Sequence, residues 1–205
     1  MKCLTKSAED KIKEAAIKVF LEKGFDGTTT RDIAKEAGVN SALMNYYFRS
    51  KEKLFSSVFE EMLQLFFEGL IEILNRPISL KDKISNMIDH DFDMFKANPD
   101  LSNFVIHELH RNPDRFFSAV SFDKILVHSI FAQQLNDAIK QEAVRKIDIQ
   151  HILLLMKSNI QFIFQGKVMT CKIWNMEDNE FDEFAEKHRL IVKEMILNYL
   201  FSSEK

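Results

Sequence analysis

The stretch that decides the fold covers residues 29–48 and reads TTRDIAKEAGVNSALMNYYF. Threonines before Ile33 and a glycine at position 38 predict a helix of two turns, because Thr is favoured at a helix N-cap and Gly just after a helix end. Asn40 is a second N-cap candidate and predicts another short helix. Two such helices joined by a glycine turn are typical of a helix-turn-helix. The side chains expected on its buried side are Ile33, Ala37, Met44 and Phe48.

The rest of the chain also predicts helices. Apolar residues recur every three or four positions over residues 7–23 and 51–75, on either side of the motif. Further helices are expected between prolines and caps, over residues 79–98, 101–111, 121–146, 149–175 and 179–201. The sequence therefore predicts an all-α fold, with an N-terminal three-helix module that contains the helix-turn-helix and a larger helical domain behind it. We place the boundary between domains 1–55 and 56–205.

The composition agrees with this fold class. The 205 residues include only 5 Gly and 3 Pro, whereas sandwiches, barrels and phosphate-binding loops need many of both. The two cysteines, Cys3 and Cys171, are too few for a disulfide framework, and no signal peptide is visible. Every uncharged stretch is too short for a membrane span, which needs about 20 residues. We expect a cytoplasmic protein without a membrane segment.

Charge is divided unevenly along the chain. Residues 1–55 contain eleven Lys and Arg against eight Asp and Glu, a net charge of +3. Residues 56–205 contain seventeen against twenty-three, a net charge of −6. The pattern favours a polyanionic partner for the N-terminal module alone, although charged surfaces are commonly just solvated.

The motif belongs to a longer pattern of ordered residues. This pattern is Ile12…Ala15-Ala16…Phe20…Gly24, then Thr28-Thr29-Thr30…Ile33-Ala34…Ala37-Gly38-Val39, then Tyr46-Tyr47-Phe48-x-x-Lys51-Glu52-x-Leu54-Phe55. In it the sequence resembles the TetR family of bacterial transcriptional regulators, over about a quarter of the chain. The resemblance implies a ligand-responsive repressor that binds a palindromic double-stranded DNA operator as a homodimer and is released by a small molecule.

The resemblance also implies residues that contact DNA. Phosphates favour helix N-termini and cations, whereas Asn and small side chains suit base edges in the major groove. Phosphate contacts are expected from Thr29, Thr30, Arg31, Tyr46, Tyr47 and Lys51, and base contacts from Asn40, Ser41, Ala42 and Asn45. Many members of the family have a small hydroxyl residue in place of Leu43 and a tyrosine in place of Asn45, so base preference does not transfer.

Each of these assignments has a structural alternative. Tyr46 or Tyr47 would equally serve as a core aromatic of the small domain. Asn40 would act only as an N-cap, and Lys51 only as a solvated lysine.

The family resemblance further implies an effector pocket among the middle helices. Such pockets are mostly apolar with a few polar groups, which predicts an apolar or amphipathic effector. Candidates on the inward faces of long helices are Met62, Phe66, Phe92, Phe95, Phe104, His107, Phe131, Asn159 and Phe162. The alternative for the phenylalanines is that they form ordinary core.

The last two helices have apolar faces broader than one helix pair can cover. These faces comprise Ile149, Ile152, Leu153, Met156, Ile160, Ile163 and Phe164, and Phe184, Leu190, Ile191, Met195, Leu197 and Leu200. We expect a four-helix interface between two copies of the chain, with completion of a single core as the alternative.

Two further functions remain open at this point. His107 and His110 lie three residues apart on a predicted helix, a spacing that suits a zinc site and a helical metal-dependent hydrolase. No cysteine and only scattered carboxylates accompany them, so an ordinary histidine pair is the simpler interpretation. The other alternative is a helix-turn-helix interaction protein that does not bind DNA. No catalytic residues, metal or cofactor are expected.

Overall fold

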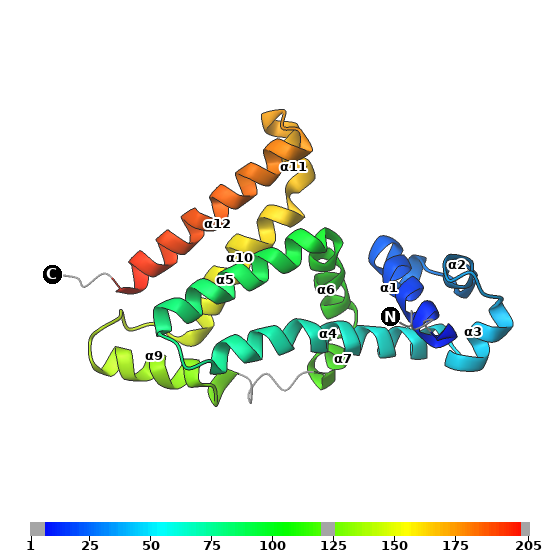
Figure 1. Ribbon diagram of the computed structural model, residues 1–205, viewed down its shortest axis with the longest axis horizontal. Coiled ribbons are helices and arrows are strands. Elements are labelled where there is room, and N and C mark those ends of the chain that lie inside the picture. Colours follow the sequence, from blue (N-terminus) through cyan, green and yellow to red (C-terminus); the bar gives the residue numbers. More distant parts are fainter. Residues whose placement is uncertain (1–6, 120–125, 202–205) are drawn as a thin grey trace, which may run out of the picture. The chain divides into compact units, whose positions relative to one another are not determined.

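The computed structural model describes residues 7–119 and 126–201, except for the side chains of residues 65, 66, 102, 115, 116 and 119. Every regular element in those residues is an α-helix, which confirms the predicted fold class (Figure 1). The helices are α1 (Ala8–Gly27), α2 (Thr30–Glu36), α3 (Ser41–Phe48), α4 (Lys51–Asn75), α5 (Leu80–Ala97), α6 (Pro99–Arg111), α7 (Pro113–Ala119), α9 (Ile130–Lys140), α10 (Ile149–Gln165), α11 (Lys167–Trp174) and α12 (Asp178–Phe201). None of these described helices has the length and apolar character needed to cross a bilayer.

The chain divides into two compact units. Unit 1 comprises the described residues up to Phe66 together with Phe104–Ala119, and unit 2 comprises Phe67–Asn103 and the described residues from 126 onward. Helices α4 and α6 therefore each run from one unit into the other. The boundary predicted after residue 55 separates a DNA-binding domain from an effector domain, and it stays a prediction. The compact units divide the chain differently, because unit 1 also contains α4 up to Phe66 and α6 from Phe104.

Local signals set the helix boundaries of unit 1. Ser7 and Asp10 form a capping box at the start of α1, with the Asp10 amide donating to the Ser7 hydroxyl at 3.1 Å. Gly38 follows α2 with a φ of 66°. This is the left-handed region that glycine adopts without a steric penalty, so the chain turns sharply there into α3.

The core of unit 1 is aromatic. The ring of Phe55 on α4 meets the rings of Phe20 and Phe25 on α1 edge-on, with centroids 4.9 and 4.8 Å apart. Phe104 on α6 joins the same cluster, 5.9 Å from the ring of Phe59. Edge-to-face rings of this kind contribute about 1 kcal/mol beyond their buried area. Phe104 is therefore a core residue of unit 1.

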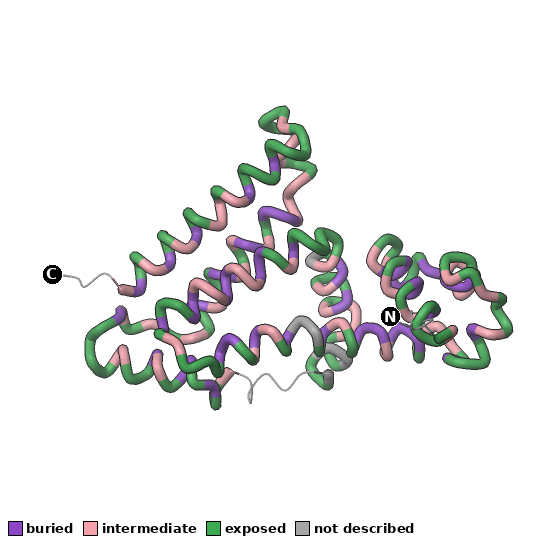
Figure 2. Tube along the Cα trace, viewed as in Figure 1, coloured by how far each residue is buried: buried purple, intermediate pink, exposed green. Residues whose placement is uncertain are grey.

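Unit 2 is built around α5, which contacts α9, α10 and α12. Phe92 on α5 is fully buried, and its ring meets that of Phe164 on α10 at 5.2 Å. Buried residues recur along both α5 and α10 (Figure 2). Ion pairs reinforce the contacts of α5 with α10 and α12. Lys157 of α10 lies 2.6 Å from Asp91, and Lys193 of α12 lies 2.5 Å from Asp89.

Three predicted helices have clearly different bounds in the structure. The helix expected over residues 7–23 continues as α1 to Gly27, across a kink at Gly24, whose φ is 69°. The helix expected over residues 149–175 is divided at Gly166 into α10 and α11, because glycine is a poor helix former and the backbone leaves helical geometry there. Of the helix expected over residues 121–146, residues 130–140 form α9, which begins after the N-cap Ser129, and residues 126 and 127 are also helical. Residues 121–125 lie outside the described part of the chain.

Candidate nucleic-acid interface

Helices α2 and α3 form the predicted helix-turn-helix. Ile33 and Met44 are fully buried, and Phe48 is also buried, so these three side chains fix the two helices on the rest of unit 1. Ala37 is only partly buried. The Val39 amide donates to the carbonyl of Ala34 at 3.0 Å, which closes the turn between the helices.

The exposed face of α3 is polar and aromatic. Ser41, Ala42 and Asn45 are exposed, and Leu43 is partly buried. Tyr46 is 79% exposed and Tyr47 is 40% exposed, so neither is a core aromatic of the small domain. Their rings meet edge-on, with centroids 5.4 Å apart. No side chain of α3 carries a charge, which suits contact with base edges more than attraction to phosphates.

The start of α3 is capped as predicted. The Asn40 side-chain oxygen accepts a hydrogen bond from the Leu43 amide at 2.8 Å. This bond leaves the side-chain NH2 group of Asn40 without a role in the cap. Capping and base contact are therefore compatible at this residue, because they use different atoms.

The start of α2 is closed by a capping box. The Thr29 amide and hydroxyl both donate to the Asp32 carboxylate, at 2.9 and 2.6 Å, and the Asp32 amide donates back to the Thr29 hydroxyl at 3.2 Å. Hydrogen bonds from Thr29, with Lys23 as a further partner, lower the pKa of Asp32 from 3.8 to about 2. The amide and hydroxyl of Thr29 are thus engaged in the cap. Thr30 is partly exposed and Arg31 is exposed, so both side chains are accessible to a phosphate.

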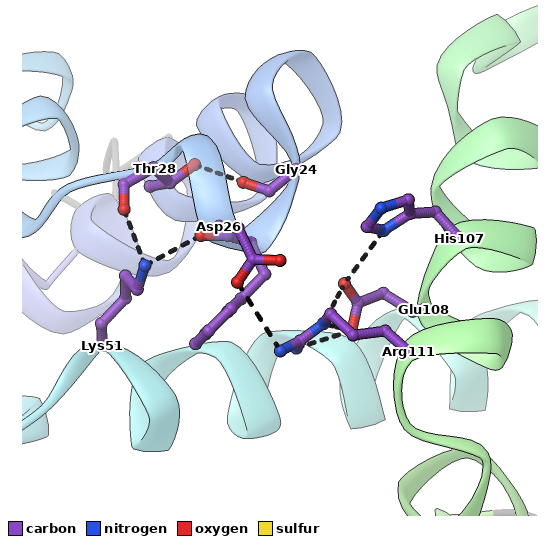
Figure 3. Close-up of polar contacts among 8 residues, drawn as sticks. Gly24, Asp26, Thr28, Lys51, His107, Glu108 and Arg111 are labelled. Carbon is purple, nitrogen blue, oxygen red and sulfur yellow. Dashed lines mark hydrogen bonds and ion pairs between the residues drawn. The ribbon is translucent and has the colours of Figure 1, made fainter.

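Lys51 has partners that the sequence does not reveal. Its ammonium group donates to the backbone carbonyls of Phe25 and Thr28, both at 2.9 Å, and lies 4.2 Å from the centroid of the Phe25 ring (Figure 3). These bonds connect the start of α4 to the end of α1. Two of its three N–H donors serve the fold, so Lys51 is more than a solvated lysine. Its role as a phosphate contact stays a prediction.

A group on α6 completes unit 1 and was missed by the sequence reasoning. The Glu108 side chain is 2% exposed and accepts three hydrogen bonds from the Arg111 guanidinium, at 2.8 to 3.1 Å. Arg111 also lies 4.1 Å from the Phe25 ring centroid and 4.0 Å from Asp26 (Figure 3). The three-residue spacing of Glu108 and Arg111 was the available signal.

The neighbouring histidines do not form a metal centre with this group. His107 is 62% exposed in its side chain and lies 3.7 Å from Glu108, while His110 is also exposed. In the described residues, no three His, Cys, Asp or Glu side chains come together in a way that would hold a metal ion. The hydrolase alternative therefore lacks a set of ligands there.

The candidate effector residues are distributed over both units. Met62, Phe104 and His107 belong to unit 1, and Phe92, Phe95, Phe131, Asn159 and Phe162 belong to unit 2. Phe92, Phe95 and Phe131 are buried, whereas Phe162 is 61% exposed and His107 lies at the surface. The side chain of Phe66 lies outside the described part of the structure. Their role in a pocket stays a prediction.

A helix-turn-helix whose second helix, α3, presents an uncharged polar and aromatic face is typical of DNA-binding transcriptional regulators. Residues 12–58 match the family described as bacterial regulatory proteins, tetR family. The chain is 30% identical over 161 residues to the biofilm operon icaADBC HTH-type negative transcriptional regulator IcaR of Staphylococcus aureus, covering 72% of this chain and 78% of that protein. The chain belongs to the TetR family, and it is a ligand-responsive DNA-binding regulator.

Two further comparisons agree in length and fold. The chain is 25% identical over 172 residues to the fatty acid metabolism regulator protein of Bacillus subtilis, covering 84% of this chain and 86% of the relative. The crystal structure of the transcriptional regulator FadR from Bacillus subtilis in complex with stearoyl-CoA superposes with a TM-score of 0.66 at 20% identity, covering 93% and 98% of the two chains. The relatives are regulators and not enzymes.

Proposed function

We propose that the chain is a cytoplasmic repressor that binds a palindromic operator as a homodimer and is released from it by a small molecule. The observation that carries the proposal is the exposed face of α3 on a rigid helix-turn-helix. The staphylococcal relative is named a negative transcriptional regulator, which supports repression as the outcome.

The proposed DNA contacts follow from exposure and chemistry. Asn45 and the NH2 group of Asn40 suit adenine, which offers an acceptor and a donor in the major groove, and the Ala42 methyl suits thymine. Ser41 completes the base-facing set. The proposed phosphate contacts are Thr30, Arg31, Tyr46, Tyr47 and Lys51, with Thr29 acting through the helix end that it caps.

The proposed dimer interface is an apolar seam on α10 and α12. Large apolar side chains there are exposed, although soluble monomers rarely expose large contiguous apolar patches. Most of the face expected on α10 is buried within the single chain instead, namely Ile152, Met156, Ile160, Ile163 and Phe164, and so is Leu200 of α12. The seam of exposed residues comprises Leu154, Leu155 and Phe162 of α10 and Phe184, Leu190, Ile191, Met195 and Tyr199 of α12. Two seams that pair around a two-fold axis would form a four-helix interface. The dimer would then present two copies of α3, the reading helix, to the two halves of one palindrome.

The proposed effector is apolar or amphipathic, and we place it with the candidates of unit 2, which are Phe92, Phe95, Phe131, Asn159 and Phe162. The candidates Met62, Phe66, Phe104 and His107 lie in unit 1 and are not included in this proposal. The similarity of this chain to the fatty acid metabolism regulator protein of Bacillus subtilis supports an effector with an apolar part. Helices α4 and α6 both begin in one unit and end in the other, so a change in unit 2 has two covalent routes to unit 1. Differential binding of the effector to the two states would reduce operator affinity by a coupling free energy of about 1–3 kcal/mol.

The test is a gel shift with the DNA that flanks the protein's own gene, repeated over a salt series. Specific binding that weakens steeply with salt is expected, because neutralised phosphates release counterions. Tyr46→Ala should weaken binding without loss of stability, since Tyr46 is 79% exposed. Phe117→Ala, which removes an exposed aromatic outside the motif, is the matched control. A protein that binds no DNA in this assay would instead be the interaction protein.

A further inference from the structure

One lysine of unit 2 is buried where the core is otherwise apolar. Lys83 lies in the second turn of α5 and is 0% exposed. The buried face of α5 on which it lies also contains Leu80, Ile84, Met87 and Ile88. Lysine is almost never fully buried unless it is paired, so this position needs a physical reason.

Lys83 differs from every other described side chain that has a buried polar atom without a hydrogen-bond partner. Four residues share this property: Lys83, Gln134, Arg145 and Arg189. Gln134 donates through its NH2 group to the Ile78 carbonyl, Arg189 forms ion pairs through its terminal nitrogens, and the Arg145 guanidinium lies over the Tyr199 ring. The only polar side-chain atom of Lys83 is its amine, and no described group accepts a hydrogen bond from it.

The same helix carries a second buried ionisable side chain, and that one has a partner. Asp91, two turns further along α5, is 1% exposed and pairs with Lys157 at 2.6 Å. Asp91 therefore has a counter-ion supplied by α10. Lys83 has no such counter-ion among the described residues, although it is buried as deeply.

An unpaired amine at this position costs folding free energy. Burial disfavours the charged form and lowers the pKa of Lys83. The neutral amine still leaves a buried polar group unsatisfied, at a cost of about 1–3 kcal/mol. A methionine would fill a similar volume without this penalty. An anion that reaches Lys83 would restore the charged form and would gain a strong hydrogen bond in a medium of low dielectric constant.

We propose that the Lys83 amine binds the anionic group of the effector, and that the effector is an amphipathic molecule with an apolar chain and a terminal carboxylate or phosphate. This inference rests on the proposed function for the existence of an effector. Leu80, Ile84, Met87 and Ile88 are buried beside Lys83 in the chain without ligand, so the alkyl chain would enter by displacing part of this packing. Among the described residues of that face, Lys83 supplies the unpaired cation.

The test measures binding to the full-length protein by calorimetry, with three ligands that share one alkyl chain. Stearate carries a carboxylate, stearoyl-CoA carries phosphates, and stearyl alcohol carries no charge. We expect the wild type to bind at least one of the two anions more tightly than the alcohol. Lys83→Met should weaken that anion about tenfold or more, because a charge-assisted hydrogen bond is lost.

Two further variants keep the test specific. Lys81→Met removes an exposed lysine from the same helix and should leave the affinity for the anion unchanged. Lys83→Gln keeps a polar group without the charge and should also weaken binding, so the test does not depend on one variant folding. We expect Lys83→Met to raise the melting temperature of the protein without ligand, since an unsatisfied amine is removed.

Several results would overturn the inference. They are equal affinity of the wild type and Lys83→Met for the anions, equally tight binding of stearyl alcohol to the wild type, and failure of both anions to bind. Dependence on Lys83 for stearate identifies a carboxylate, and dependence for stearoyl-CoA alone identifies a phosphate. The gel shift is independent of these titrations, so failure of the proposed DNA binding is distinguished from failure of the anion site.

Discussion

Asp32 shows how one residue at the edge of the proposed DNA-binding surface stabilises the fold. Its carboxylate accepts two hydrogen bonds from Thr29 and lies at the N-terminal end of α2, where a negative charge is favoured. It also lies 3.1 Å from Lys23. The ionised carboxylate therefore stabilises the short helix on which the motif depends.

The pH dependence of stability tests this role. The pKa of Asp32 falls from 3.8 to about 2 on folding, so its contribution is complete above about pH 4 and is lost as the pH falls towards 2. We expect the wild type to melt at a higher temperature than Asp32→Asn near neutral pH, and the difference to shrink below pH 4. Thermal unfolding over a pH series measures this. A difference that stays constant down to about pH 2 would contradict the assignment.

Lys51 allows a second test at this scale, because it has a structural role and a predicted DNA contact. Loss of its two bonds to the carbonyls of Phe25 and Thr28 should lower the free energy of unfolding of Lys51→Met by about 1–3 kcal/mol. Denaturant unfolding measures the loss. Lys53→Met, an exposed lysine two residues along α4, is the control and should leave stability unchanged. Normal stability with weaker DNA binding would mean that Lys51 acts on phosphate alone.

At the scale of elements, the ion pair of Glu108 and Arg111 on α6 stabilises the packing of that helix in unit 1, where Arg111 also contacts α1. Arg111→Met would leave the buried Glu108 carboxylate without its guanidinium partner. Removal of one partner of a buried ion pair typically costs about 3–5 kcal/mol. We expect a smaller loss for the double variant Glu108→Leu with Arg111→Met, because no unpaired charge remains. Denaturant unfolding of both single variants and the double variant measures the coupling, and additive losses would contradict it.

The caps and turns of this chain were predictable from the sequence, and the contacts between residues far apart in the sequence were not. The caps at Thr29 and Asn40 and the turn at Gly38 depend on neighbours within a few residues, so the sequence pattern predicts them directly. The pattern leaves open whether Tyr46 or Tyr47 joins the core, and the structure exposes both. The partners of Lys51 are backbone carbonyls more than twenty residues away, and no side-chain pattern records them.

The candidate effector residues show a second limit of the sequence. Phe104 and Phe92 both occur on helices with apolar faces, which predicts burial for each. The pattern does not show which core each joins, and the structure places Phe104 in unit 1 and Phe92 in unit 2. Phe162 was expected on an inward face but is 61% exposed, since it belongs to the apolar seam of α10.

At the scale of the whole molecule, the charge distribution agrees with DNA binding by the N-terminal module and a different function for the rest of the chain. The net charge of +3 lies in residues 1–55, which contain the helix-turn-helix, and the net charge of −6 lies in the rest. A module with so small a positive charge and one short reading helix gains little affinity from phosphates alone. Two modules on one dimer would bind a palindrome far more tightly than either module separately.

The dimer seam is therefore the feature on which operator binding should depend most. Ile191→Asp places a charge in the middle of the seam on α12, where the side chain is 51% exposed in the single chain. We expect light scattering to give a wild-type mass of twice the chain mass of 24.0 kDa and a variant mass of one chain. Operator affinity should fall about a hundredfold or more, although no DNA-facing residue has changed.

The control for this prediction is Gln133→Asp, which adds the same charge to an exposed position of α9 outside the seam. It should keep the dimer and the operator affinity of the wild type. A dimeric Ile191→Asp variant would show that the exposed apolar residues of α10 and α12 do not hold the two copies together. A monomeric variant with full operator affinity would show instead that one reading helix is sufficient, because the loss of the second module would then cost no binding free energy.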